Sequence, residues 1–206
     1  MPTLYDIKPQ FQSLLRPLVA WLAAAGVTAN QITIGAAILS LAGGALCLLA
    51  PGSRLVLGLV AAVLAIRMGL NAIDGMLARE HDQKSRTGLI YNEAGDVVSD
   101  AGLYLPLGIA LAPLGVAIWP VIAFAFAAFL TEFVGVLGPH LGASRRYDGP
   151  MGKSDRAIAI AIILALLALG VPGGAWVSGA IAVMAALALW TAIRRARAIL
   201  EEGTPQ

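Results

Sequence analysis

Apolar residues fill most of this chain, in segments long enough to cross a membrane. Predominantly apolar segments cover residues 32–50, 55–78, 88–111 and 119–138, and a last uncharged stretch covers 157–193. About 20 apolar residues span the hydrocarbon core of a bilayer, so the last stretch is too long for one crossing. The Gly- and Pro-rich run at 170–174 divides it, as Pro113-Leu-Gly115 separates the third and fourth segments. The pattern predicts an all-α polytopic membrane protein with six transmembrane helices.

The first segment has a different pattern. Residues 5–25 place Phe11, Leu14 and Leu18 on one stripe of a helix, whereas the polar residues lie mostly elsewhere. This is typical of an amphipathic helix that lies on the membrane surface. Thr28-Ala-Asn-Gln31 then has the pattern of a capping box, which would open the first crossing. We therefore expect one membrane domain over residues 1–206, with a surface helix at 5–25 and a six-helix bundle at 30–197.

Composition supports this class. Of the 206 residues, 59% are hydrophobic and only 13% charged, and the mean hydropathy is +0.82. These values lie far outside the range of a soluble domain of this size. The single cysteine, Cys47, lies in an apolar run, which excludes a disulfide framework or a cysteine-based metal site within one chain.

The basic residues predict the orientation. With six crossings, both termini lie on one side of the membrane, and nearly all basic residues of the polar segments fall on that side. Only Arg54 falls on the opposite side. Because basic loops stay in the cytoplasm, the termini are expected to be cytoplasmic. The basic residues on the side of the termini are Lys8, Arg16, Arg79, Lys84, Arg86, Arg145, Arg146, Lys153, Arg156, Arg194, Arg195 and Arg197.

Polar residues interrupt the apolar pattern between residues 71 and 100. A carboxylate at membrane depth costs about 2.5–3.5 kcal/mol, so these residues should face each other rather than lipid. Two antiparallel helices joined by the polar turn at 80–87 would bring them together, and a divalent cation would neutralise such a cluster of oxygens. Helical spacing puts Asn71, Asp74 and Ala78 on one face, and Asn92, Asp96 and Asp100 on another.

Two further features belong to the same stretch. Gly75, Ala78 and Gly88 have almost no side chain and leave room for a ligand to lie against the backbone. Arg67 precedes Asn71 by four residues and shares its helix face, where it could pair with an acid or reach a phosphate.

These residues resemble the signature of the CDP-alcohol phosphotransferase (CDP-alcohol phosphatidyltransferase) family. That signature reads Asp, two residues, Asp-Gly, two residues, Ala-Arg, eight residues, Gly, three residues, Asp, three residues, Asp. The chain differs at the first and third aspartates, where it has Asn71 and Asn92, and in this it is similar to a bacterial inner-membrane branch of the family. The matching residues are Asp74, Gly75, Ala78, Arg79, Gly88 and Asp96.

The resemblance implies a role for each residue. Asp74 would be a metal ligand, and Asp96 a metal ligand or the general base, with Mg²⁺ or Mn²⁺ as the ion. Asn71 and Asn92 could ligate through their amide oxygens, so the site would hold its cation less tightly, or hold one ion where relatives hold two. The residues implied to bind the donor are Gly75, Ala78, Arg79 and Gly88, and those implied to bind the acceptor are Lys153, Arg156 and Arg67.

The implied reaction moves a phosphatidyl group from CDP-diacylglycerol to the hydroxyl of a polar alcohol and releases CMP. The family also implies a homodimer in the bacterial inner membrane, with no nucleic acid partner. The acceptor could be glycerol phosphate, inositol phosphate, serine or a rarer alcohol, and the residues do not decide between them.

Two alternatives to this enzyme remain open. A catalytically silent relative that binds nucleotide lipid would explain the two asparagines, and an ion-coupled transporter would also place acids in the membrane.

The sequence leaves the roles of three further acidic residues open. Glu93 is a metal ligand or contacts another helix, Asp100 is expected to orient its neighbours rather than bind metal, and Glu132 would pair with Arg67 or Lys153 or meet the acceptor.

Overall fold

The structure is a computed structural model that describes residues 4–202, with side chains from residue 10 onward. Lys8, one of the basic residues counted above, therefore lies outside the described side chains. The described chain is helical, without strands, and two single-turn 3-10 helices, η1 (Ala112–Leu114) and η2 (Pro139–Leu141), follow α4 and α5. The α-helices are α1 (Leu4–Ala24), α2 (Ala29–Leu49), α3 (Arg54–Glu80), α4 (Arg86–Leu111), α5 (Ile118–Leu137), α6 (Lys153–Ala168) and α7 (Ala175–Glu202).

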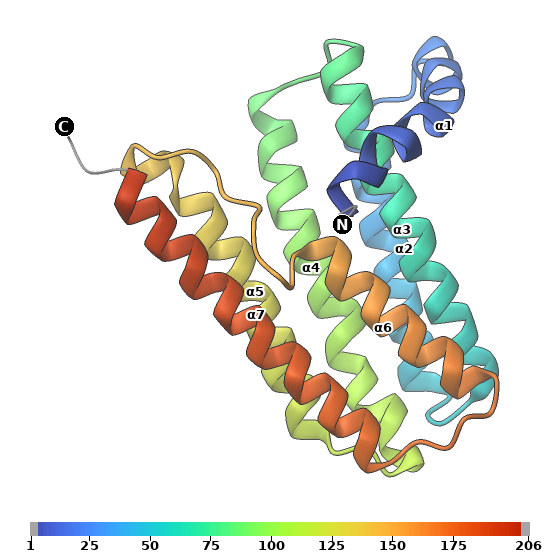
Figure 1. The fold of residues 1–206 in the computed structure, drawn as a ribbon. Coiled ribbons are helices and arrows are strands. Elements are labelled where there is room, and N and C mark those ends of the chain that lie inside the picture. Colours follow the sequence, from blue (N-terminus) through green and yellow to red (C-terminus); the bar gives the residue numbers. More distant parts are fainter. Residues whose placement is uncertain (1–3, 203–206) are drawn as a thin grey trace.

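The polytopic helical class is confirmed, but the count of six crossings is not. Among the described residues, five helices are long and apolar enough to cross a membrane, namely α2, α3, α4, α5 and α7. Helix α6 has 16 residues, which corresponds to about 24 Å at 1.5 Å per residue. Before it, residues 142–152 return into the bundle as irregular chain beside α4 (Figure 1). Gly142 and Gly149 have positive φ angles of 77° and 125°, which are not helical, so the chain at these residues is not part of α6.

The predicted helix starts are formed by side-chain caps. The Gln31 amide N–H donates to Thr28 Oγ1 at 3.2 Å, and the Thr28 N–H donates to Gln31 Oε1 at 2.9 Å, which completes the capping box of α2. Ser85 is a simple N-cap of α4, since its Oγ accepts a hydrogen bond from the Gly88 N–H at 2.9 Å. The turns expected at Pro113–Gly115 and residues 170–174 separate α4 from α5 and α6 from α7.

The helices pack in two connected groups. Helix α2 packs against α3 and α4, and α3 also packs against α6, whereas α5 and α7 run side by side and join the rest through α4. Figure 1 shows α1, the turn between α3 and α4, and the end of α7 at the same end of the bundle. Buried apolar residues from α3 to α7 form one core, including Leu57, Leu64, Leu103, Phe124, Ile160, Leu164 and Met184.

Helix α1 lies against the part of α3 that carries the polar residues. Val19 is fully buried in a small cluster with Ile73, Met76 and Leu77. The opposite side of α1 exposes the apolar side chains of Phe11, Leu14, Leu18 and Trp21. This arrangement fits the predicted amphipathic helix, because one apolar side packs on the protein while the other is free to enter the membrane interface.

Helices α2 and α4 approach closely at two glycines. A Cβ atom on Gly44 would overlap the carbonyl oxygen of Gly102, and one on Gly102 would lie 2.6 Å from the Leu41 side chain. Small residues permit this close approach of helix backbones in a membrane protein. The crossing sets the distance between α2 and α4.

We expect Gly44→Ala to destabilise the protein by about 1–3 kcal/mol, because the added methyl group forces the two backbones apart. The measurement is thermal unfolding in detergent micelles. Gly35→Ala is the matched control, since Gly35 is in the same helix and a Cβ there meets no atom within 4 Å. Equal unfolding temperatures for the two variants would contradict the close crossing.

Candidate functional site

The turn between α3 and α4 brings Asp74 and Asp96 into one site. The two helices run antiparallel on either side of residues 81–85 (Figure 1). Both carboxylates are buried, with 5% and 7% of their residue surface exposed. They lie close enough for their charges to interact. Asp74 and Asp96 therefore lie near each other, as helical spacing predicted.

Asp74 is oriented by a residue that the sequence reasoning missed. Thr33 of α2 donates a hydrogen bond from Oγ1 to Asp74 Oδ2 at 2.9 Å, and the same hydroxyl lies 3.1 Å from the carbonyl oxygen of Ala29. Thr33 is a polar residue inside an apolar segment, one turn after the capping box. That position was the available signal, but the sequence alone did not show which carboxylate it would meet.

Asp96 forms an ion pair with Lys153, the first residue of α6. The Lys153 side chain is 25% exposed, so its ammonium group sits at the mouth of the site rather than deep in the bundle. Its charge also reaches Asp74 and Asp100. Lys153 is thus the cation next to the two carboxylates.

Asn71 and Asn92 lie one helical turn before Asp74 and Asp96, respectively, and both are partly buried. Neither side chain forms a hydrogen bond with another described residue. Among the described residues, no group of three His, Cys, Asp or Glu side chains is arranged to hold a metal ion. Two carboxylates and two amides are therefore the available oxygen donors. Such a set suits a hard divalent ion that keeps several of its waters, and Lys153 shows that a cation is accommodated beside Asp96.

Other protein side chains lie against the small residues in this structure. The Arg79 guanidinium folds back over Gly75, so that a Cβ there would be 3.1 Å from both of its terminal nitrogens. A Cβ on Gly88 would meet Ser85 Oγ at 2.9 Å and Asn30 Oδ1 at 3.0 Å. Asn30, in the first turn of α2, is a second residue that the sequence reasoning did not place here. Arg79 is exposed and makes no ion pair with any described residue.

A buried ion network lies one turn deeper than Asp96. Arg67 donates to Asp100 Oδ1 at 2.5 Å, and Arg156 donates to Asp100 Oδ2 at 3.1 Å and to Glu132 Oε1 at 2.9 Å. The four side chains come from α3, α4, α5 and α6, and each is less than 8% exposed. Their formal charges cancel, as expected for charges kept away from water.

The network decides several roles that the sequence left open. Glu132 is paired with Arg156. The sequence reasoning had offered Arg67 or Lys153 as its partner, and neither forms this pair. Asp100 orients its neighbours through two arginines, as expected. Two of the three predicted acceptor residues, Arg67 and Arg156, are therefore engaged by protein carboxylates, and the third, Lys153, is paired with Asp96.

The loop between α5 and α6 is fixed at both sides, which positions Lys153. Arg145 donates to Glu93 of α4 at 2.7 Å, so Glu93 contacts the loop rather than standing free as a metal ligand. On the other side, buried Arg195 of α7 donates to the carbonyl oxygens of Tyr147 at 2.8 Å and Asp148 at 2.9 Å. Sequence reasoning counted Arg195 only as a terminal basic residue.

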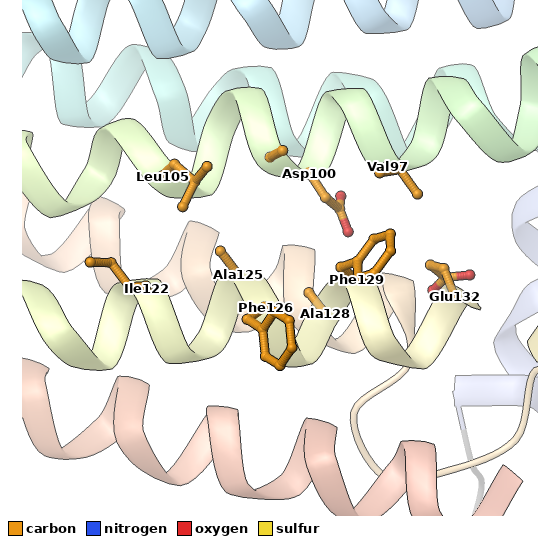
Figure 2. Close-up of a pocket in the computed structure, with 10 residues that line it drawn as sticks. Val97, Asp100, Leu105, Ile122, Ala125, Phe126, Ala128, Phe129 and Glu132 are labelled. Carbon is orange, nitrogen blue, oxygen red and sulfur yellow. The ribbon is translucent and has the colours of Figure 1, made fainter. Parts of the chain in front are cut away.

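A groove of about 300 Å³ opens between α4 and α5 beside the network (Figure 2). Its lining is apolar apart from Asp100 and Glu132, and Figure 2 shows the Asp100 carboxylate pointing from α4 into the space between the helices. Asp74, Asp96 and Lys153 do not line it. The groove is therefore an apolar surface next to the polar site and not the polar site itself.

Comparison with known proteins agrees with the motif. Residues 26–193 match the family model of CDP-alcohol phosphatidyltransferases. The chain is also similar to the inner membrane protein YnbA of Escherichia coli, with 47% identity over 198 residues, which cover 96% of each chain.

Solved structures show the same fold. Phosphatidylinositol phosphate synthase of Mycobacterium tuberculosis with CDP-DAG bound aligns with a TM-score of 0.74 at 18% identity, over 92% of this chain and 96% of that chain. A second structure of that synthase, in complex with manganese and citrate, also gives a TM-score of 0.74 at 18% identity, over 92% of this chain and 91% of that chain. At this identity the likeness establishes the fold.

We expect Asp100→Asn to destabilise the protein by about 3–5 kcal/mol, because it leaves Arg67 and Arg156 with too little negative charge in a buried site. Unfolding in detergent micelles, followed by heat or denaturant, measures the change. Glu80→Gln is the control, since it neutralises the exposed partner of Arg16 and should leave the unfolding temperature nearly unchanged. A similar small effect from Asp100→Asn would show that the network does not support the fold.

Proposed function

The chain belongs to the CDP-alcohol phosphatidyltransferase family, and we propose that it transfers a phosphatidyl group from CDP-diacylglycerol to the hydroxyl of a polar alcohol, releasing CMP. The observation that carries this proposal is that Asp74 and Asp96 lie buried near each other on two antiparallel helices, next to three residues with almost no side chain. Purely structural acids would be neutralised by arginines, as Asp100 is.

The cytidine diphosphate part of the donor would lie against Gly75, Ala78 and Gly88, none of which has a side chain larger than a methyl group. Arg79 must leave its position over Gly75 for this to happen. Since its guanidinium has no ion pair to break, it can turn toward a phosphate of the donor and form charge-assisted hydrogen bonds. The acyl chains would extend along the helices into the bilayer.

Asp74 and Asp96 would hold a divalent ion, Mg²⁺ or Mn²⁺, together with the amide oxygens of Asn71 and Asn92. When bound, such an ion supplies positive charge for the diphosphate as the leaving group gains electrons. The manganese complex of the Mycobacterium tuberculosis synthase supports a metal in this fold. With two carboxylates in place of four, the site is suited to one ion.

Asp96 is also placed to act as the general base. In the proposed reaction the acceptor oxygen forms a bond to the phosphorus attached to the lipid, and the bond from that phosphorus to the oxygen of CMP breaks. The acceptor proton passes to Asp96, and CMP leaves with the bonding electrons. Burial of Asp96 keeps bulk water from competing with the acceptor.

Lys153 is the acceptor contact that we favour among the predicted basic residues. It is partly exposed and stands at the mouth of the site, whereas Arg67 and Arg156 are almost fully buried and hold Asp100. The two arginines would then influence the acceptor through the position of α4 and α6. An anionic alcohol fits a site whose accessible basic groups are Lys153 and Arg79.

We further propose that the protein lies in the inner membrane as a homodimer, with both termini and the site on the cytoplasmic side. The location is supported by the relative, which is named an inner membrane protein. The orientation is supported by the basic residues of the α3–α4 turn and of the end of α7, which lie at one end of the bundle (Figure 1).

We expect purified protein with CDP-diacylglycerol, Mn²⁺ or Mg²⁺ and a panel of polar alcohols to release CMP, measured by chromatography. Asp74→Asn and Asp96→Asn should each lower the rate by at least about 100-fold, because each removes a charged ligand and the second also removes the base. Asp82→Asn is the matched control, since Asp82 is an exposed residue of the α3–α4 turn with a φ angle of 54° that asparagine tolerates.

Full activity in both site variants would contradict the assignment of the site. If the unmodified protein released no CMP with any alcohol, while Asn71→Asp combined with Asn92→Asp created activity, the chain would instead be a catalytically silent relative.

A further inference from the structure

Lys153 and Asp96 hold each other in a site that we propose for a metal ion. The ammonium group is paired with one carboxylate, Asp96, and its charge also reaches the other, Asp74. A divalent ion held by the same two carboxylates would occupy the same region of negative potential. An ammonium group and a divalent cation cannot both lie against one carboxylate without strong repulsion.

Lys153 neutralises a larger share of the negative charge of the site in this chain than it would in a chain with all four aspartates of the motif. Asp74 and Asp96 carry two formal negative charges, and Lys153 neutralises one of them. With four carboxylates, the same lysine would neutralise only a quarter of the charge. Asn71 and Asn92 add no charge, so a metal ion here competes with Lys153 for a small negative charge.

The helix end itself does not attract the Lys153 ammonium group. It is the first residue of α6, and the amino-terminal end of a helix repels a cation. The loop before it is held by Arg145 and Arg195 through contacts with Glu93, Tyr147 and Asp148. The backbone is thus fixed while the long side chain, 25% exposed, has space to swing outward. Asp96 is the group that keeps it in place.

We propose that Lys153 is the resident counter-cation of this site: it binds Asp96 when no divalent ion is present and is displaced from it when an ion binds. The inference rests on the metal site in the proposed function. Once displaced, the ammonium group remains at the mouth of the site and is free to bind a phosphate of the acceptor. Metal binding and recognition of an anionic acceptor are therefore coupled, and each strengthens the other by the same factor.

The first experiment measures the affinity for Mn²⁺ alone, without substrates. Unmodified protein, Lys153→Met and Lys84→Met are titrated with manganese chloride in detergent micelles, and free Mn²⁺ is followed by electron paramagnetic resonance. Lys153→Met should bind Mn²⁺ at least about tenfold more tightly than the unmodified protein, because no internal cation has to be displaced. Lys84→Met, in the exposed turn between α3 and α4, should bind as the unmodified protein does.

The second experiment uses the unmodified protein, so it does not depend on the folding of a variant. The chain has three lysines, Lys8, Lys84 and Lys153, and their acetylation by an amine-reactive ester can be followed by mass spectrometry. Lys153 should react slowly without metal and several-fold faster with saturating Mn²⁺. The reactivity of Lys84 should not change.

Each outcome has a definite meaning. Equal or weaker Mn²⁺ binding by Lys153→Met, or unchanged or slower acetylation of Lys153 with Mn²⁺, overturns the displacement. If one of these outcomes is found while the unmodified protein binds Mn²⁺, the displacement of Lys153 is wrong but the proposed metal site is retained. If neither protein binds Mn²⁺, both the metal site and this inference are wrong.

Discussion

The position of Asp100 between Arg67 and Arg156 is the constraint on which the rest of the site depends. Through this carboxylate, α3 and α6 are both held against α4, and Glu132 adds α5 through Arg156. Four charges in an apolar bundle are stable only while they remain together, so the helices cannot shift independently. Asp96 lies one turn above Asp100 on the same helix, and its place relative to α3 and α6 follows from this network.

The network separates structural acids from reactive ones. Asp100 and Glu132 are paired with arginines, which always remain charged, whereas Asp74 meets a hydroxyl and Asp96 a flexible lysine. Only Asp74 and Asp96 can therefore exchange their partners for a metal ion and a substrate. Helix α1 packs behind Asp74 and the loop from 142 to 152 leads to Lys153, so elements at one end of the bundle support the same site.

Sequence reasoning predicted the helices and the meeting of Asp74 with Asp96, because apolar length and helical spacing are local properties. It did not predict which charges pair. Glu132 and Arg156 lie on separate helices whose rotation is set by packing, for example at Gly44 and Gly102. It also predicted a crossing in the first part of residues 157–193, where α6 has only 16 residues and is not among the five described helices long enough to cross a membrane. Apolar composition alone does not show where such a helix ends.

The central claim is that Asp74 and Asp96 form the ion-binding part of the site while Asp100 and Glu132 do not. An experimental structure of the protein with Mn²⁺, with anomalous diffraction to locate the metal, tests it most directly. The account predicts an anomalous peak within coordination distance, about 2.0–2.6 Å, of carboxylate oxygens of both Asp74 and Asp96, with Arg67 and Arg156 still bound to Asp100. A peak at Asp100 or Glu132, or one that touches neither Asp74 nor Asp96, would contradict it.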